Sequence, residues 1–151
     1  MLYLLFSLGP DRYALKASEV LVMLPVPVMK ALPGTPAWVA GLAYDALGAY
    51  PVIDLAALTL SRPSHQVMST RLAQVDYCDR QGVSRRLGVI VERATSTLRA
   101  ADDAFEPAGV ATPESPFLGP VLRRDDGVIQ RITINDLLPS AVSDRLFAEA
   151  V

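Results

Sequence analysis

The stretch LPGTPAWVAGLAYDALGAYPVIDL, residues 32–55, holds three prolines, three glycines and Trp38, the only tryptophan of the chain. Prolines and glycines at this density predict tight turns between short elements. Apolar residues over 37–44 and again over 50–53 predict two strands, joined by a turn at residues 45–48. The stretch is therefore predicted to turn a β-rich domain around a hydrophobic surface, and nothing in it resembles a catalytic centre.

Apolar runs on both sides of this stretch predict further short strands. They are expected over residues 2–8, 12–15, 20–24, 70–77, 87–91, 94–98, 118–122 and 128–133, which gives about nine or ten strands in all. Turns recur roughly every eight to twelve residues, and this spacing favours barrels or sandwiches over a parallel sheet. Because strands this short curl readily, we predict a mainly β single domain over residues 1–151, made of two small packed barrels and divided near residues 61–69.

Helices are expected to be short and to flank the strands. Asp54 is placed to N-cap a helix over residues 55–60, because its carboxylate can accept from the first free N–H groups. The tail is predicted as an amphipathic helix, since apolar residues recur at helical spacing at Val142, Leu146 and Ala150.

Two loops differ from ordinary connections. Residues 25–36 carry four prolines, which fix φ and remove backbone donors, so they predict a stiff loop over the core. Residues 99–117 are longer than the connections that compact domains usually carry.

Composition excludes several classes of function. Hydrophobic residues make up 51% and charged residues 20% of the 151, and the mean hydropathy is +0.30. A chain this apolar is expected to keep some apolar surface for a partner. The net charge of -2 and the pI of about 5.3 argue against a nucleic-acid-binding small barrel, which needs a clustered basic face.

The cellular compartment is predicted from the cysteine count and the apolar runs. The single cysteine, Cys78, excludes an internal disulfide framework and fits a reducing compartment. It follows an apolar strand and is expected to be a buried, inert thiol. The N-terminal apolar run lacks a positive segment before it, and the other runs are shorter than the ~20 residues that span a bilayer. We therefore expect a cytoplasmic protein.

No residue pattern predicts catalysis, a cofactor or a metal. His65, the only histidine, lies in a polar segment and is expected to be solvated, and no C-x-x-C or phosphate-binding glycine motif occurs. The carboxylate pairs at residues 102–103 and 125–126 fall in predicted loops, where bonding to local backbone explains them. Glu92 is expected to form a surface pair with Arg93. An enzyme that uses these carboxylates therefore has little support.

A series of motifs runs almost from end to end of the chain. They are LFSLG at residues 5–9, YAL at 13–15, Val20, LPGTPAWVAG at 32–41, PVIDL at 51–55, LGVIVE at 87–92, FLG at 117–119, GVIQ at 127–130 and NDLL at 135–138. In this order and spacing they resemble the CheW family, the scaffold adaptors of bacterial chemotaxis-type signalling. The short length, together with STRL at 69–72 and ERAT at 92–95, is most similar to the short adaptors of Wsp-type surface-sensing systems.

This resemblance implies both a fold and a function. The fold is two small five-stranded, SH3-like β-barrels packed on each other, with short helices and a C-terminal helix. The function is a non-catalytic scaffold that couples the cytoplasmic tip of a methyl-accepting chemoreceptor to a CheA-type histidine kinase, whose regulatory domain has the same fold. The resemblance implies no cofactor and a location at the inner face of the membrane.

The chain departs from the family at two charged positions. The family usually has N-L-R-G before P-V-x-D-L, but here the arginine and glycine positions hold Ala46 and Leu47. Family members also tend to carry glutamate where this chain has Val22. An exposed Glu-Arg pair contributes only ~0–1 kcal/mol, so the fold should survive its loss, whereas charges at an interface set specificity.

Two hypotheses follow from this departure and stay open. The protein uses a more apolar contact at these positions, or it is a divergent regulator or competitor that meets a different partner. Trp38 is expected either to anchor the core or to be an interface hot spot. The residues expected to bind a partner are Val20, Val22, Trp38, Leu42, Tyr44, Ala46 and Leu47.

Overall fold

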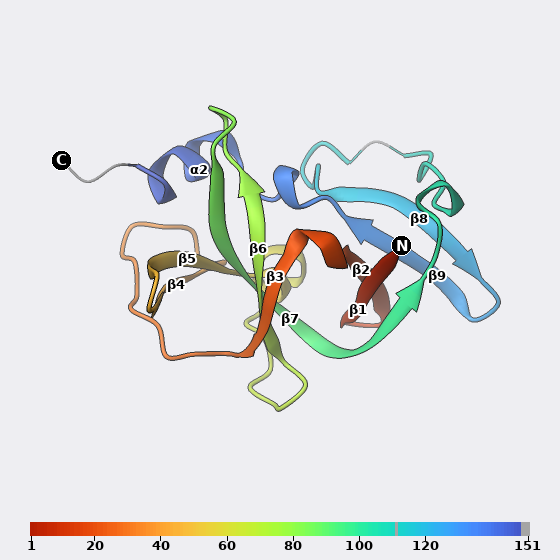
Figure 1. Cartoon of the computed structure of the whole chain (residues 1–151), viewed down its shortest axis with the longest axis horizontal. Coiled ribbons are helices and arrows are strands. Elements are labelled where there is room, and N and C mark those ends of the chain that lie inside the picture. Colours follow the sequence, from red (N-terminus) through yellow and green to blue (C-terminus); the bar gives the residue numbers. More distant parts are fainter. Residues whose placement is uncertain (111, 149–151) are drawn as a thin grey trace.

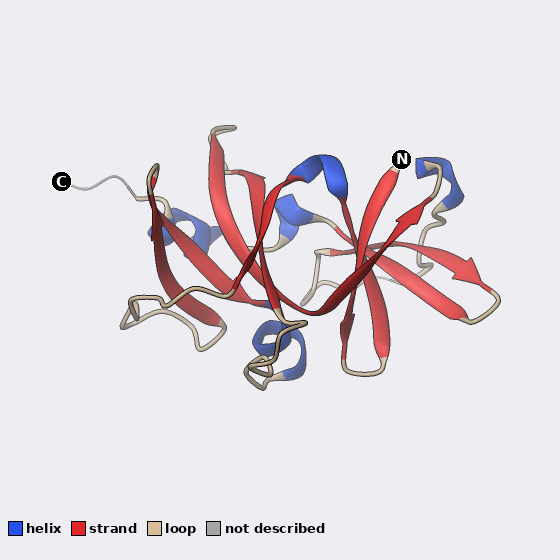
Figure 2. Ribbon diagram, turned by 60° about the horizontal axis from the view of Figure 1, so that its bottom comes forward, coloured by secondary structure: helices blue, strands red, loops and turns tan. Residues whose placement is uncertain are grey.

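The described strands form two five-stranded barrels that share one long strand, β7 (Ser84–Arg99) (Figure 1). The computed structural model describes residues 1–110 and 112–148. The other strands are β1 (Leu2–Leu8), β2 (Asp11–Lys16), β3 (Val20–Pro25), β4 (Val39–Asp45), β5 (Gly48–Asp54), β6 (Arg71–Cys78), β8 (Leu118–Arg124) and β9 (Gly127–Ile132). The helices are α1 (Leu55–Leu60) and α2 (Ser140–Leu146), with 3-10 turns η1 (Ala17–Glu19), η2 (Asp102–Ala104) and η3 (Ile134–Asp136). Figure 2 shows these helices outside the two groups of strands.

The first barrel combines the two ends of the chain. Strand β1 pairs with β2 and with the last part of β7, β2 pairs in parallel with β9, and β9 pairs with β8. The predicted division of the barrels near residues 61–69 is therefore wrong. Because β2 pairs with β9 and β1 pairs with the last part of β7, no single cut in the sequence separates the barrels.

The second barrel is built from the middle of the chain. It contains β3, β6, the first part of β7, β5 and β4. Residues 61–69 connect α1 to β6 within this barrel. The proline-rich loop lies along β4, where Lys30 and Leu42 exchange two backbone hydrogen bonds of 2.9 and 2.8 Å.

Strand β7 replaces the two strands that the sequence predicts over residues 87–91 and 94–98. The polar pair Glu92-Arg93 interrupts the apolar pattern, but the backbone stays in the sheet. Arg93 adopts a φ of 51°, and the register against β1 shifts between Leu5 and Ser7. A bulge of this kind bends a strand and strengthens its twist, so β7 passes from one barrel into the other.

The predicted helices form where their capping and periodicity place them. Helix α1 spans the predicted residues, and the Asp54 carboxylate accepts from the N–H groups of Ala56 at 3.1 Å and Ala57 at 3.4 Å. Helix α2 confirms a C-terminal helix, while Ala150 of the predicted apolar stripe lies outside the described residues. Among the described residues no helix is both long and apolar enough to cross a bilayer.

Three apolar clusters fill the molecule. The second barrel encloses Ala43, Tyr50, Val52, Leu72 and Ile90, and the first barrel encloses Tyr3, Leu5, Ala14, Phe105 and Ile129. A third, larger cluster, here called the central core, packs side chains of both barrels together with residues of α1 and the segment after β9.

Strand β6 is buried on both faces, but Cys78 at its end is exposed, not buried as predicted. Successive side chains of a strand point to opposite faces. Tyr77 therefore points into the central core and Cys78 points away from it.

Candidate protein-binding surface

The β4–β5 hairpin closes one end of the second barrel. Asp45 pairs with Gly48 across a two-residue turn, as the sequence predicts. The Asp45 carboxylate accepts from the Leu47 N–H at 2.9 Å, and Gly48 adopts a φ of 117°. These are the residue types that such a turn needs. An aspartate carboxylate accepts from the backbone N–H two residues later, and glycine tolerates positive φ.

Apolar side chains project from this end into solvent. Leu47 at the tip is 84% exposed and Tyr44 is 59% exposed, while Val22 on strand β3 is 40% exposed. Leu42 and Ala46 complete the group, the first half-buried and the second exposed. Large exposed apolar side chains gathered at one end of a domain indicate a contact surface.

A charged pair lies beside these apolar side chains. The Asp45 carboxylate forms an ion pair with Arg86 of β7 and lies 3.4 Å from the Gln74 amide nitrogen. The Arg86 guanidinium also lies 4.6 Å from the centre of the Tyr50 ring and donates to the Gly48 carbonyl at 3.2 Å. Hydrogen bonding to Arg86 holds the pKa of Asp45 below its ordinary value. The pair therefore stays ionised at neutral pH.

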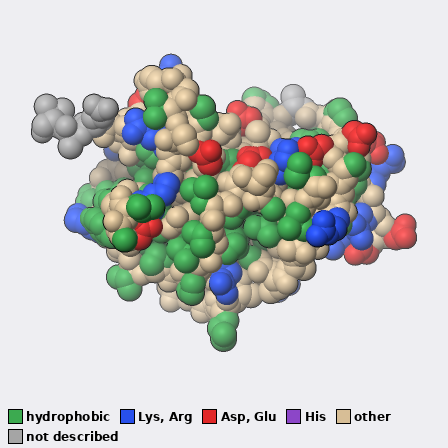
Figure 3. Space-filling model, viewed as in Figure 1, with side chains coloured by type: hydrophobic (Ala, Val, Ile, Leu, Met, Phe, Trp, Pro, Cys, Tyr) green, Lys and Arg blue, Asp and Glu red, His purple; other side chains and the backbone are tan. Residues whose placement is uncertain are grey.

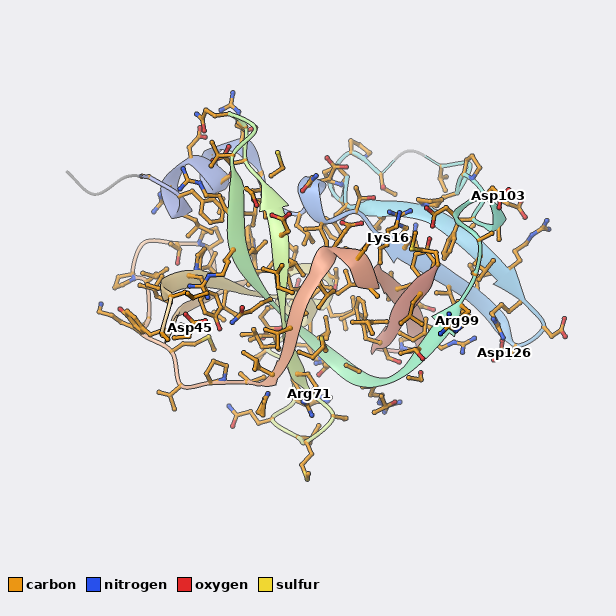
Figure 4. The ribbon with its side chains drawn as sticks, in the orientation of Figure 1. Lys16, Asp45, Arg71, Arg99, Asp103 and Asp126 are labelled. Carbon is orange, nitrogen blue, oxygen red and sulfur yellow. The ribbon has the colours of Figure 1, made fainter. Side chains whose placement is uncertain are left out.

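The two positions at which this chain departs from the family, Val22 and Ala46, lie at the same end of the second barrel. Val22 pairs in register with Gln74, whose amide reaches Asp45, the residue before Ala46. The surface is not wholly apolar, because the Asp45–Arg86 ion pair lies beside its apolar side chains. Figure 4 shows Asp45 at this end of the barrel. The sequence missed Arg86, since it lies 41 positions from Asp45 and no local pattern connects them.

Two of the seven predicted residues are not part of this surface. Val20 and Trp38 are half-buried and pack against the central core. The Trp38 carbonyl accepts from the Asp54 N–H at 2.8 Å, which ties the segment before β4 to the end of β5. This packing favours the core-anchor interpretation of Trp38. We call the remaining five residues, Val22, Leu42, Tyr44, Ala46 and Leu47, the hairpin surface.

The predicted surface pair between Glu92 and Arg93 is wrong. Glu92 is only 5% exposed, and Arg62 clamps its two carboxylate oxygens at 2.8 and 3.0 Å. The His65 backbone N–H also donates to it at 2.7 Å. Hydrogen bonding to Arg62 lowers the pKa of Glu92. The exposed His65 side chain places its Nδ1 atom 3.4 Å from the same carboxylate. The carboxylate therefore fastens residues 61–69 to the point where β7 changes barrel.

One carboxylate of each Asp pair bonds side chains from distant strands, not the local backbone as predicted. Asp102 hydrogen-bonds to the Tyr3 hydroxyl and to Lys16, while Asp126 pairs with Arg12 at 2.9 Å. No cluster of three or more His, Cys, Asp or Glu side chains in residues 1–110 and 112–148 is arranged to hold a metal ion.

Comparison with known proteins agrees with this architecture. The family model of the CheW-like domain matches residues 2–142. The chain belongs to the CheW family. The crystal structure of the scaffolding protein TtCheW from Thermoanaerobacter tengcongensis superposes with a TM-score of 0.77 at 21% identity, over 89% of this chain and 84% of that one. A comparison with curated protein sequences returns no match. The family is one of chemotaxis-type scaffold adaptors, and this general role comes with membership.

Proposed function

We propose that this CheW-family protein is a non-catalytic scaffold that couples a methyl-accepting chemoreceptor to a CheA-type histidine kinase. It contacts the cytoplasmic tip of the receptor and the regulatory domain of the kinase, in the cytoplasm at the inner face of the membrane. The match over residues 2–142 supports this proposal because it includes both barrels. The function needs no cofactor, no nucleic acid and no insertion into the membrane.

The observation that carries the proposal is the hairpin surface. It combines exposed aliphatic and aromatic side chains with the Asp45–Arg86 ion pair. Interfaces between proteins have this composition, an apolar centre that gives affinity and neighbouring charges that set specificity. Leu47 and Tyr44 are the side chains that we expect to anchor the partner. Val20 and Trp38 support the surface from the side of the central core.

A pull-down with a methyl-accepting chemoreceptor and a CheA-type kinase of the same organism tests the proposal. The native chain is expected to capture both. Leu47→Asp is expected to weaken capture about tenfold or more, because it places a charge where an apolar side chain becomes buried in the complex. Leu47 is 84% exposed in the free chain, so the fold should not change.

Val128→Asp is the matched control for this pull-down. Val128 is 51% exposed and lies on β9 in the first barrel, away from the hairpin surface, so capture should stay within about twofold. A folded native chain that captures neither partner would show that the adaptor proposal is wrong.

The second candidate is a divergent regulator or competitor, favoured by Val22 and Ala46 in place of the family's glutamate and arginine. Restoring both charges is expected to change which partner is captured. Val22→Glu alone should destabilise the fold by about 1 kcal/mol, because it adds a carboxylate beside the Gln74–Asp45 contact. Adding Ala46→Arg should recover about half of that loss.

Urea denaturation of the two single variants and the double variant measures this coupling, and the same pull-down measures partner choice. Unchanged partner choice and affinity in the double variant would contradict the competitor hypothesis.

A further inference from the structure

A groove of about 940 Å³ opens at the other end of the second barrel. The hairpin surface lies where β4 ends and β5 begins, whereas this groove reaches Ala40 near the start of β4, Asp54 at the end of β5 and Arg71 at the start of β6. One wall is residues 25–29 of the proline-rich loop, and the other is formed by residues 63–68. None of the residues of the hairpin surface lines it.

The groove is apolar at its rim and at its floor. Val28 on one wall is 97% exposed and Met68 on the other is 95% exposed. The floor includes Ile90, which belongs to the apolar interior of the barrel, and Met29 of the first wall packs against the same interior. Figure 3 shows hydrophobic side chains over the lower part of this face, where β3 and the following loop run. An apolar hollow that continues from a barrel interior to exposed aliphatic side chains fits an apolar ligand face.

The charged groups of the groove favour an acidic partner. The Asp54 carboxylate is already occupied, since it caps α1 and accepts from the Ser64 N–H at 2.9 Å and from the Ser64 hydroxyl. Arg71 differs, because this half-buried residue lines the groove and its guanidinium forms no ion pair with a carboxylate of the described residues. A carboxylate of the partner would supply the missing counter-ion and fix the register of the contact. Figure 4 shows Arg71 well apart from Asp45 of the hairpin surface.

The walls of the groove select a helix over an added strand. Pro25 and Pro27 in one wall and Pro63 in the other have no N–H, so they cannot donate to the ladder of a bound strand. A helix satisfies its own backbone and presents only side chains to such a groove. We propose that this groove binds an amphipathic helix of a partner protein, with aliphatic side chains along one face and a Glu or Asp facing Arg71. This contact is additional to the receptor and kinase contacts proposed for the hairpin surface.

A selection experiment tests the proposal on the whole chain. The probe is a displayed library of helical peptides with aliphatic residues at i, i+4 and i+7 and all other positions random. Selected peptides are expected to carry Glu or Asp at one fixed place beside the aliphatic stripe. Binding of a selected peptide, measured by fluorescence anisotropy, should fall about tenfold or more in Val28→Asp, while the matched change Leu47→Asp should keep it within about twofold.

A charge reversal identifies the role of Arg71. Arg71→Glu should lose the acidic peptide and regain binding when its Glu is replaced by Lys, and Arg71→Met tests loss of charge where the reversal prevents folding. The proposal is overturned if no peptide is enriched, if Val28→Asp leaves binding unchanged, or if the acidic position has no effect. Self-association of the native chain that Val28→Asp abolishes would also overturn it, in favour of a second copy in the groove.

Discussion

Gly41→Ala is expected to lower the free energy of unfolding by about 3–4 kcal/mol, which is a large share of a typical domain's stability of about 5–15 kcal/mol. A Cβ at this position would lie 2.5 Å from the Lys30 carbonyl oxygen and 3.2 Å from Met29 Cβ. Gly41 also adopts a φ of 148°, which side chains rarely tolerate. The Lys30 carbonyl accepts from the Leu42 N–H at 2.8 Å, so relief of the clash breaks the contact that holds residues 25–30 against β4.

Gly48→Ala is the matched control for this prediction. Gly48 lies in the same hairpin and has a φ of 117°, but nothing lies within 4 Å of a Cβ built there. The Gly48→Ala variant should therefore lose only about 1 kcal/mol of unfolding free energy, which is the cost of placing a side chain at this positive φ. Urea denaturation of both variants separates the clash from the backbone strain. Equal losses in the two variants would show that residues 25–30 give way without cost.

Local signals predict the elements of this fold well. The apolar run before Asp54, the capping carboxylate and the turn at residues 45–48 are each set by residues within a few positions of one another, and each forms where the sequence predicts it. The pairing that joins the two ends of the chain in the first barrel is different, because it depends on residues more than one hundred positions apart. Arg12 of β2 pairs with Ile129 of β9, and no pattern in either strand indicates this partner.

The candidate site divides in the same way. The motif series located the hairpin surface, because the family's N-L-R-G and P-V-x-D-L segments fall on one hairpin. The ion pairs that define the electrostatics were not predictable, since Glu92 lies 30 positions from Arg62. Glu92 and Arg93 look like an adjacent surface pair in the sequence. In the structure the bulge turns them apart, so that Glu92 is buried and Arg93 is exposed.

Glu92→Gln is expected to cost about 2 kcal/mol of stability at neutral pH. The change keeps the shape but removes the charge that accepts from Arg62 and from the His65 N–H, and bonds to a charged group contribute about 1.5–3 kcal/mol each. We place the estimate at the low end because the Arg62 side chain is partly exposed and water can replace its partner. Glu106→Gln is the control, because Glu106 and Arg123 form an exposed pair, whose loss should cost no more than about 0.5 kcal/mol.

The dependence of this loss on pH distinguishes the buried ion pair from simple packing. Hydrogen bonding to Arg62 lowers the pKa of Glu92 below its ordinary value of 4.5. A carboxyl group whose pKa falls on folding contributes stability above its unfolded pKa, and that contribution is lost as the pH drops through the folded pKa. The difference in unfolding free energy between the native and Glu92→Gln proteins, here called the gap, should therefore be constant from neutral pH down to about 5. It should narrow below pH 4.5 and vanish once Glu92 is protonated. Urea denaturation along a pH series measures the gap. A gap that stays constant down to pH 2 would mean that Glu92 stabilises residues 61–69 through its shape, and that its charge contributes nothing.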